Sequence, residues 1–482
     1  MFPARAALAR GDGGCLTCVK VARGAGLYGR GMNAAAPSRA LLALAEAKVP
    51  RYTSYPTAAQ FGPLDEGTYR GWLRDGIGAK DALSLYLHVP FCRDLCWYCA
   101  CHAKPTRSEA RIDALAAALE AEADLLAAAL PEHGGVSHLH LGGGTPTILG
   151  PARIRALVMG LKARFGFRAG AEIAIELDPR LLEEAMVDTL GEVGVTRASL
   201  GVQDISPEVQ ARIGRPQPAE LVSVAVERLR RAGIGSVNLD LMYGLPGQTT
   251  AHVEASARFA AWLDADRIAV FGYAHVAWMK PNQRAIDATT LPGAEARMEQ
   301  AEAAGAVLSA AGYAALGLDH FAKPADPLAR AAAAGRLRRN FQGYTTDDAP
   351  VLLGLGPSAI GSLPGGMAGN VLDERTHGDA VAEGHLPVAR GVAVTAEDRA
   401  RGAIIERLMC DFALDLQTVA PGMEPVVAAA LEAMAPLAGQ GLVEVSPGRV
   451  VVTELGRRFV RQVAACFDAY LAPSETRHSA AV

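Results

Sequence analysis

Short β-rich runs alternate with Ala-, Leu- and Glu-rich helical stretches between residues 83 and 273. Such alternation is typical of parallel strands joined by right-handed helical crossovers. Six such units are fewer than the eight that close a full barrel, so the pattern predicts an α/β fold with an open (β/α)6, three-quarter TIM-like barrel. The predicted strands are 83–89, 136–141, 172–177, 198–202, 237–242 and 268–273, and the predicted helices are 108–130, 152–165, 181–193, 218–232 and 252–263.

Three cysteines follow the first predicted strand directly. Pro90 ends that strand because proline lacks the N–H that a strand ladder needs. Cys92, Cys96 and Cys99 have the spacing CxxxCxxC, which is too compact for two paired zinc half-sites and lets a loop place three thiolates on one face of an iron–sulfur cube. Three ligands for four irons leave one iron open for a small molecule with an amine and a carboxylate. A structural metal knot and a chance spacing of cysteines are the alternatives.

Polar residues follow the ends of the later strands, where chemistry gathers in sheets of this kind. The second strand runs into the turn GGGTP at 142–146, whose glycines let backbone amides approach a ligand, although an ordinary tight turn also fits. Glu176 ends the third strand, as a cavity residue or a solvated rim residue. Asp240 alternates with aliphatic residues in the fifth strand, and a buried acid needs a partner. We therefore expect Asp240, Gln203 and Arg215 to form one polar constellation.

The cysteine motif and its strand resemble those of the radical S-adenosylmethionine enzymes. Further segments resemble the oxygen-independent coproporphyrinogen III oxidases within that superfamily: RYTSYPT at 51–57, GGGTP at 142–146 and NFQGYTT at 340–346. The resemblance extends over nearly the whole chain. It implies a three-quarter barrel, a 4Fe-4S cluster and S-adenosylmethionine as cofactors, and Cys92, Cys96 and Cys99 as the cluster ligands. It implies cofactor contacts from Tyr86, Tyr98, Gly143, Gly144, Thr145, Glu176, Gln203, Arg215, Asp240, Ala274 and Ile360.

Cys101 extends the motif to CxxxCxxCxC and separates this resemblance from two others. Haem-binding chaperones related to the oxidases share the barrel, the three cysteines and the GGGTP turn, but they generally lack Cys101 and the RYTSYPT leader, and this sequence has both. A different radical enzyme, such as a methyltransferase, is a third interpretation. We expect Cys101 to act in catalysis and not as a ligand, because it could reach the open iron only by displacing the cofactor.

The resemblance implies a reaction and its partners. The substrate would be coproporphyrinogen III, two of whose propionates undergo oxidative decarboxylation to vinyl groups, giving protoporphyrinogen IX in haem and porphyrin biosynthesis. Each vinyl group would need its own radical, hence two S-adenosylmethionine molecules per product. An electron donor such as flavodoxin or ferredoxin would reduce the cluster, and we expect a monomer.

Composition limits the partners and the compartment. The chain has 482 residues with 47 basic and 51 acidic side chains, so nothing favours a broad surface for a phosphate backbone, and nucleic acid is not an expected partner. No run of about 18 apolar residues is present that could span a bilayer. Cysteines gather at the motif and do not form a disulfide framework, which favours a reducing cytoplasm.

The two ends of the chain differ from its middle. Residues 1–31 carry five basic residues and one acidic residue without a sustained period, so we expect a disordered extension, unless Met32 is the true start. Within it, Cys15 and Cys18 form a lone CxxC, which is weak evidence of a metal or redox site.

We divide the remainder into a leader at 32–80, a radical S-adenosylmethionine core with its extension at 81–390, and a C-terminal lid domain at 391–482. Helical periods at 397–413, 424–438 and 455–471 surround a predicted hairpin at 441–452. This order predicts a small, mostly helical, winged-helix-like domain.

Overall fold

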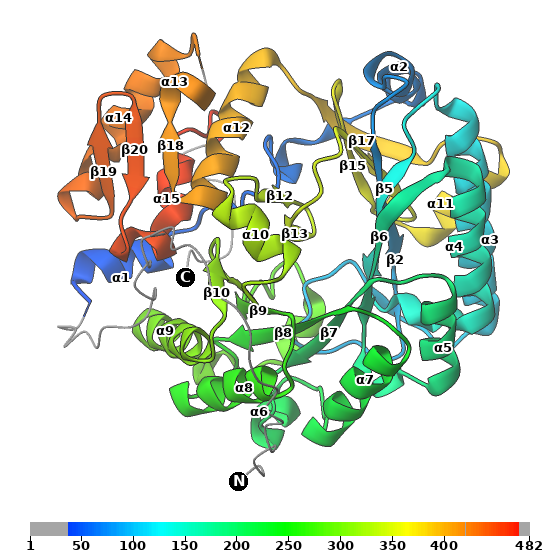
Figure 1. Ribbon diagram of the computed structural model, residues 1–482, viewed down its shortest axis with the longest axis horizontal. Coiled ribbons are helices and arrows are strands. Elements are labelled where there is room, and N and C mark those ends of the chain that lie inside the picture. Colours follow the sequence, from blue (N-terminus) through cyan, green and yellow to red (C-terminus); the bar gives the residue numbers. More distant parts are fainter. Residues whose placement is uncertain (1–36, 420, 472–482) are drawn as a thin grey trace, which may run out of the picture.

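The computed structural model describes residues 37–419 and 421–471. The expected disordered extension, Met32, Cys15 and Cys18 lie outside these residues. One large mixed sheet forms the centre of the described part, with helices on its outer face (Figure 1). Its strand order is β1-β17-β16-β15-β14-β2-β5-β6-β7-β8-β9-β11-β10.

The six predicted strands are consecutive neighbours in this sheet and run parallel, which confirms that part of the prediction. Their bounds are β2 Leu83–Val89, β5 Val136–Gly143, β6 Phe167–Leu177, β7 Arg197–Gln203, β8 Ser236–Tyr243 and β9 Arg267–Gly272. The crossover helices are α3 Glu109–Ala129, α4 Gly150–Phe165, α5 Glu184–Glu192, α7 Ala219–Arg231 and α8 Thr250–Trp262.

Side chains of the six strands alternate between two environments, as the pleat requires. One set is aliphatic and packs under the helices, for example Leu85, Leu139 and Leu239, all buried. The other set faces a cavity and is largely polar, for example Glu176 and Asp240. The polar residues named from the sequence therefore lie on the inner face of the sheet, and the aliphatic residues beside them form the core.

The sheet is larger than the sequence pattern predicts. Strand β14 (Val351–Leu355) pairs parallel with β2, and β15 (Ile360–Leu363), β16 (Gly366–Asn370), β17 (Val388–Ala393) and β1 (Gly62–Pro63) continue that edge. At the other edge are β11 (His320–Ala322) and β10 (Ala314–Leu316). Within the described residues β1 and β10 do not pair, so the sheet stays open. The domain boundary predicted at 390 falls inside β17.

The C-terminal segment folds around its own small sheet, in the order β18 (Ala413–Asp415), β20 (Arg449–Val452) and β19 (Val443–Ser446). Helices α12 (Ala396–Asp411) and α14 (Glu424–Gly439) match the predicted helical periods. The last predicted helix is wrong in form: a 3-10 turn, η6 (Leu455–Phe459), precedes a short helix, α15 (Val460–Ala465). A Cβ at Gly456 would lie 1.8 Å from the Leu442 carbonyl oxygen, so the chain passes too close to its neighbour for an ordinary helical side chain.

The leader packs under the C-terminal segment. Composition alone predicts a surface loop at 51–57, but Tyr52 and Tyr55 are buried in an apolar cluster with residues of α12 and α15. The Tyr52 hydroxyl donates to Asp468 Oδ2 at 3.0 Å, and the Tyr55 hydroxyl accepts from the Ala469 N–H at 2.9 Å. The surface-loop prediction is therefore wrong, because both rings find apolar partners far along the chain.

No helix within residues 37–419 and 421–471 combines the length and apolar character needed to cross a bilayer.

A buried carboxylate joins three parts of the fold. Glu122 on α3 accepts hydrogen bonds from the Gly356 N–H at 2.7 Å and from Asn370 Nδ2 at 2.7 Å. His377, on α11 (Glu374–Ala382), lies 2.8 Å from the same carboxylate through Nε2. Removing Glu122 would leave several buried polar groups without their partner.

We expect Glu122→Ala to lower the free energy of unfolding by about 3 kcal/mol, because its buried hydrogen-bond partners are then left unpaired. The control on the same helix is Asp124→Ala, whose carboxylate is 65% exposed and pairs with Arg164 at 2.6 Å. Asp124→Ala should lower the free energy of unfolding by less than about 1 kcal/mol. Urea unfolding followed by circular dichroism measures both, and equal losses would contradict the buried network.

Candidate functional site

A cavity of about 760 Å³ lies against the inner face of the parallel strands. Such a volume is within the usual range for small-molecule sites. The residues predicted from the sequence that line it are Cys92, Cys96, Tyr98, Cys99, Cys101, Gly143, Gly144, Thr145, Glu176, Gln203, Arg215, Asp240 and Ala274. Tyr86 and Ile360 are not among its lining residues.

The cysteine loop leaves the carboxyl end of β2 and continues through β3 (Phe91–Cys92). All described cysteines are free thiols. In the described part of the chain, no three His, Cys, Asp or Glu side chains are arranged to hold a single metal ion. A structural knot needs ligands converging on one ion, whereas cluster thiolates bind different irons.

The GGGTP turn packs directly against the cysteine loop. The Gly144 N–H donates to the Val89 carbonyl and the Thr145 N–H to the Phe91 carbonyl, both at 2.8 Å. A Cβ at Gly144 would lie 2.5 Å from the Phe91 oxygen and 3.0 Å from Cys92 Sγ. The Thr145 hydroxyl donates to Cys92 Sγ at 3.4 Å. An ordinary tight turn needs none of these contacts, so the turn shapes the space beside the first cysteine.

Glu176 presents an ionised carboxylate to the cavity. It lies 3.1 Å from His140 Nε2 and accepts the Gly143 N–H at 3.1 Å, while 40% of its side chain is exposed. Burial alone would raise its pKa, but His140 and the Gly143 amide outweigh burial and hold the pKa below its ordinary value. Glu176 can therefore accept a cationic amine.

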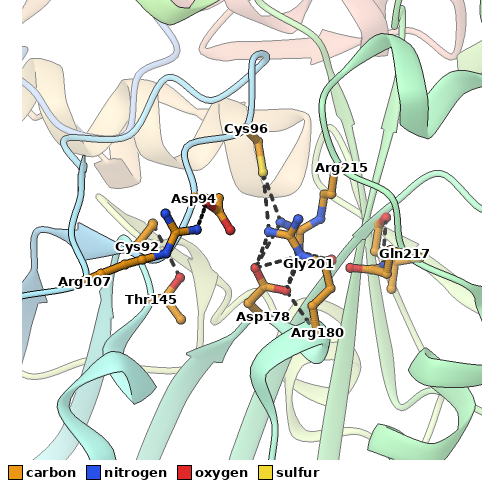
Figure 2. A network of polar contacts seen from close by, with 11 residues as sticks. Cys92, Asp94, Cys96, Arg107, Thr145, Asp178, Arg180, Gly201, Arg215 and Gln217 are labelled. Carbon is orange, nitrogen blue, oxygen red and sulfur yellow. Dashed lines mark hydrogen bonds and ion pairs between the residues drawn. The ribbon is translucent and has the colours of Figure 1, made fainter.

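The expected constellation of Gln203, Arg215 and Asp240 is only partly correct. All three line the cavity, but Arg215 pairs with Asp178 at 3.3 Å and donates to the Gly201 carbonyl at 2.7 Å. The sequence pattern missed Asp178, because it follows β6 in a loop that has no period. The Arg215 guanidinium also donates to Cys96 Sγ at 3.3 Å (Figure 2).

Asp240 obtains its partners from its own strand and the next. Ser199 Oγ donates to it at 2.8 Å and Asn238 Nδ2 donates at 2.8 Å. Burial raises the pKa of Asp240, although these two hydrogen bonds oppose the rise. Both hydrogen-bond partners of Asp240 are neutral side chains, which the sequence did not predict.

Gln203 ends β7 with a φ of 66°, in the left-handed region that favours glycine. The register of β7 against β8 shifts between Gly201 and Gln203. A backbone strained in this way at a cavity is typical of functional sites.

Three side chains that lie close together in sequence donate hydrogen bonds to the backbone of the cysteine loop. The sequence gave no reason to select them. Asn282 Nδ2 donates to the carbonyls of Cys96 at 3.1 Å and Cys99 at 2.9 Å. Gln283 Nε2 donates to the Tyr98 carbonyl at 2.8 Å and to the Ala274 carbonyl at 3.2 Å. Lys280 Nζ donates to the Cys101 carbonyl at 3.0 Å. They belong to the segment that follows β9, including the 3-10 helix η4 (Pro281–Ala285).

The remaining predicted residues have different surroundings. The Tyr86 hydroxyl is 2.9 Å from His88 Nδ1, on the same strand. Ile360 begins β15, at the edge of the parallel strands. The Cys101 thiol interacts with the Cys99 thiol, which lowers the pKa of Cys99 and raises that of Cys101. Cys101 therefore lies within reach of the predicted cluster ligands.

The far wall of the cavity comes from segments distant in sequence. Arg51 of the leader lines it, as do Asn340, Gln342, Tyr344 and Thr345 of the NFQGYTT segment. The three segments RYTSYPT, GGGTP and NFQGYTT thus meet the cysteine motif at one cavity.

Comparison with known proteins decides the family. The model of the radical SAM superfamily matches residues 86–260, and the model of the HemN C-terminal domain matches residues 394–459. An oxygen-independent coproporphyrinogen III oxidase of Bradyrhizobium diazoefficiens is 45% identical over 441 residues, covering 91% of this chain and 98% of that protein. The chain belongs to the oxygen-independent coproporphyrinogen III oxidase family. It is a radical S-adenosylmethionine oxidoreductase with a 4Fe-4S cluster and S-adenosylmethionine as cofactors.

Two further comparisons agree with this family. The oxygen-independent coproporphyrinogen III oxidase of Escherichia coli is 39% identical over 428 residues, covering 88% of this chain and 93% of the relative. The solved structure of coproporphyrinogen III oxidase from Escherichia coli, described as a radical SAM enzyme, matches with a TM-score of 0.83 and 38% identity. That match covers 88% of this chain and all of that one. The family resemblance inferred from the motifs is confirmed.

We expect Gly144→Ala to lose most of its iron after cluster reconstitution, because the new methyl group would push the Phe91 carbonyl and Cys92 Sγ away from their positions. Iron and sulfide analysis measures the loss. Gly71→Ala is the control, since a Cβ there meets nothing within 4 Å. Full iron content in Gly144→Ala would show that the turn does not shape the cluster site.

Proposed function

We propose that this chain converts coproporphyrinogen III to protoporphyrinogen IX without oxygen, by oxidative decarboxylation of two propionates to vinyl groups in haem and porphyrin biosynthesis. One observation carries the proposal: a single cavity joins the three cysteines, the GGGTP turn, Glu176 and the NFQGYTT segment. The relatives at 39–45% identity that carry the oxidase name are matched over nearly their whole length.

Cys92, Cys96 and Cys99 would bind three irons of the cluster, leaving the fourth open to the amine and carboxylate of S-adenosylmethionine. When bound, these cofactors supply a 5′-deoxyadenosyl radical that removes a hydrogen atom from the propionate β-carbon. The cofactor positions named from the resemblance are part of this proposal, including Tyr86 and Ile360, which lie outside the cavity lining.

The chain's own residues bind, orient and exclude water. Glu176, held ionised, would accept the cofactor's ammonium group, and Asp240 is placed for a hydroxyl at the end of β8. Gly143 and Gly144 allow the backbone to approach without Cβ interference. We propose that the parallel strands act as a three-quarter barrel and that the C-terminal segment is a winged-helix-like lid. The burial of Tyr52 beneath that segment, beside cavity-lining Arg51, supports such a cover.

A haem-binding chaperone is the alternative from another functional class. The positions of Cys101 and of Arg51 in the cavity lining favour the oxidase, because the chaperone relatives generally lack both the fourth cysteine and the leader. An enzyme must consume its cofactor with each radical, whereas a carrier has no such requirement.

We further propose a cytoplasmic monomer that receives its electron from a flavodoxin or a ferredoxin. The free thiols of the described cysteines support a reducing compartment.

We expect Cys96→Ala to abolish the visible absorbance of the reconstituted cluster, because one of three ligands is lost. Cys101→Ser should retain the wild-type iron and sulfide content but form product more slowly. If iron in Cys101→Ser falls as far as in Cys96→Ala, Cys101 is itself a ligand and no iron is left open.

The reaction is tested with purified protein, a rebuilt cluster, reductant, S-adenosylmethionine, coproporphyrinogen III and an electron acceptor, all without oxygen. We expect protoporphyrinogen IX together with methionine and 5′-deoxyadenosine. About two S-adenosylmethionine molecules should be consumed per product, since each vinyl group needs its own radical. Tight haem binding without decarboxylated product would instead establish the chaperone.

A further inference from the structure

Two guanidinium groups converge on one cluster cysteine. Figure 2 shows Arg180 and Arg215 side by side, both directed at Asp178 and at the sulfur of Cys96. Arg215 Nη1 donates to Cys96 Sγ at 3.3 Å, and Arg180 Nη2 donates to the same sulfur at 3.7 Å. The resemblance named Arg215 as a cofactor contact, but nothing in the sequence singled out Arg180.

Asp178 holds both guanidiniums in place. Arg180 contacts its carboxylate through Nε at 3.0 Å and through Nη2 at 2.6 Å, and Arg215 Nη2 contacts it at 3.3 Å. The side chains of Asp178, Arg215 and Arg180 are 8%, 7% and 20% exposed. The two cations and one anion together carry a net positive charge beside Cys96. Because these side chains are buried, solvent screens that charge little.

The other two cysteines of the motif have different hydrogen-bond partners. Cys92 Sγ accepts a hydrogen bond from the neutral hydroxyl of Thr145, and Cys99 interacts with the Cys101 thiol. The two guanidinium hydrogen bonds therefore act at the Cys96 sulfur, while Arg215 and Lys280 also act on Cys99 through their charge alone.

We propose that Arg180, oriented by Asp178, raises the reduction potential of the 4Fe-4S cluster through the Cys96 sulfur. Reduction adds one negative charge to the cluster, and a nearby cation with an N–H donor to a ligand sulfur stabilises that added charge. Without the guanidinium of Arg180, Asp178 and Arg215 cancel, and the net positive charge is lost. The inference rests on the cluster ligands proposed above.

This arrangement meets two opposite demands of the proposed reaction. The cluster has to accept an electron from a protein donor, which favours a higher potential, and must then reduce a sulfonium, which favours a lower one. Arg180 is not among the cofactor contacts implied by the resemblance, so its effect on the potential is measured without S-adenosylmethionine.

The test is a redox titration of the reconstituted cluster in wild type, Arg180→Gln, Arg180→Lys and Arg168→Gln, followed by electron paramagnetic resonance without S-adenosylmethionine. In Arg180→Gln the ratio of reduced to oxidised cluster at a fixed potential should fall about tenfold, equivalent to about 59 mV for a one-electron couple. Arg168→Gln removes an arginine whose hydrogen bonds go to the Gly134 and Lys80 carbonyls, and should match wild type.

Arg180→Lys keeps the charge but loses the planar donor that reaches both Asp178 and Cys96, so its midpoint should lie between those of wild type and Arg180→Gln. An unchanged midpoint in Arg180→Gln, or an equal shift in Arg168→Gln, overturns the inference. If Arg180→Gln does not bind iron, Arg180→Lys provides the test. A midpoint potential of Arg180→Lys equal to that of wild type then overturns the inference. Absence of a cluster in wild-type protein would instead refute the proposed ligands, so the two failures are distinguishable.

Discussion

The contact between the GGGTP turn and the cysteine loop fixes the cysteines against the end of the parallel sheet. The Gly144 N–H donates to the Val89 carbonyl at the end of β2, and the Thr145 N–H donates to the Phe91 carbonyl in β3. These two hydrogen bonds join the segments that follow two neighbouring parallel strands. Because a Cβ at Gly144 would meet the backbone of Phe91, the two segments approach as closely as chain atoms allow. A loop that must present three thiolates at fixed positions gains from such a rigid support, since ligand placement then follows from the sheet itself.

The polar groups of the cavity divide into two kinds of environment. Glu176 and Asp178 have cationic or amide donors beside them, and their pKa values lie below the ordinary ones. Asp240 has only neutral donors, and burial raises its pKa. Carboxylates at the ends of β6 and β8, the strands on either side of β7, thus differ in the direction of their pKa shift because their partners differ. Under the function proposed above, such a difference would suit a ligand with a cationic amine and hydroxyl groups.

Periodic sequence patterns predicted the regular strands and helices. They did not predict contacts between segments that are distant in sequence. The six parallel strands followed from alternation and β-rich composition, and most of the cavity residues followed because they stand at strand ends in the inward phase. Strands such as β16, with sequence GMAGN, carry no alternation and were missed. The sequence predicted Gln203 and Arg215 as the partners of Asp240, but Arg215 pairs with Asp178. Sequence spacing cannot show which carboxylate a guanidinium pairs with. Asn282 and Gln283 hold the cysteine loop by contacts across more than 180 residues, which no local pattern records.

The leader connects the parallel strands to the C-terminal segment, and this connection bears on how the cavity is covered. Arg51 Nη2 donates to the Gly272 carbonyl at the end of β9, while Tyr52 and Tyr55 bond to residues 468 and 469. Arg339, beside the NFQGYTT segment, donates to the carbonyls of Tyr52 at 3.2 Å and Arg51 at 3.3 Å. Each such hydrogen bond contributes about 1 kcal/mol, so separating the C-terminal segment from the strands means breaking several at once. The C-terminal segment and the cavity wall are therefore connected through residues 51–57, with Arg51 at the cavity end of that connection.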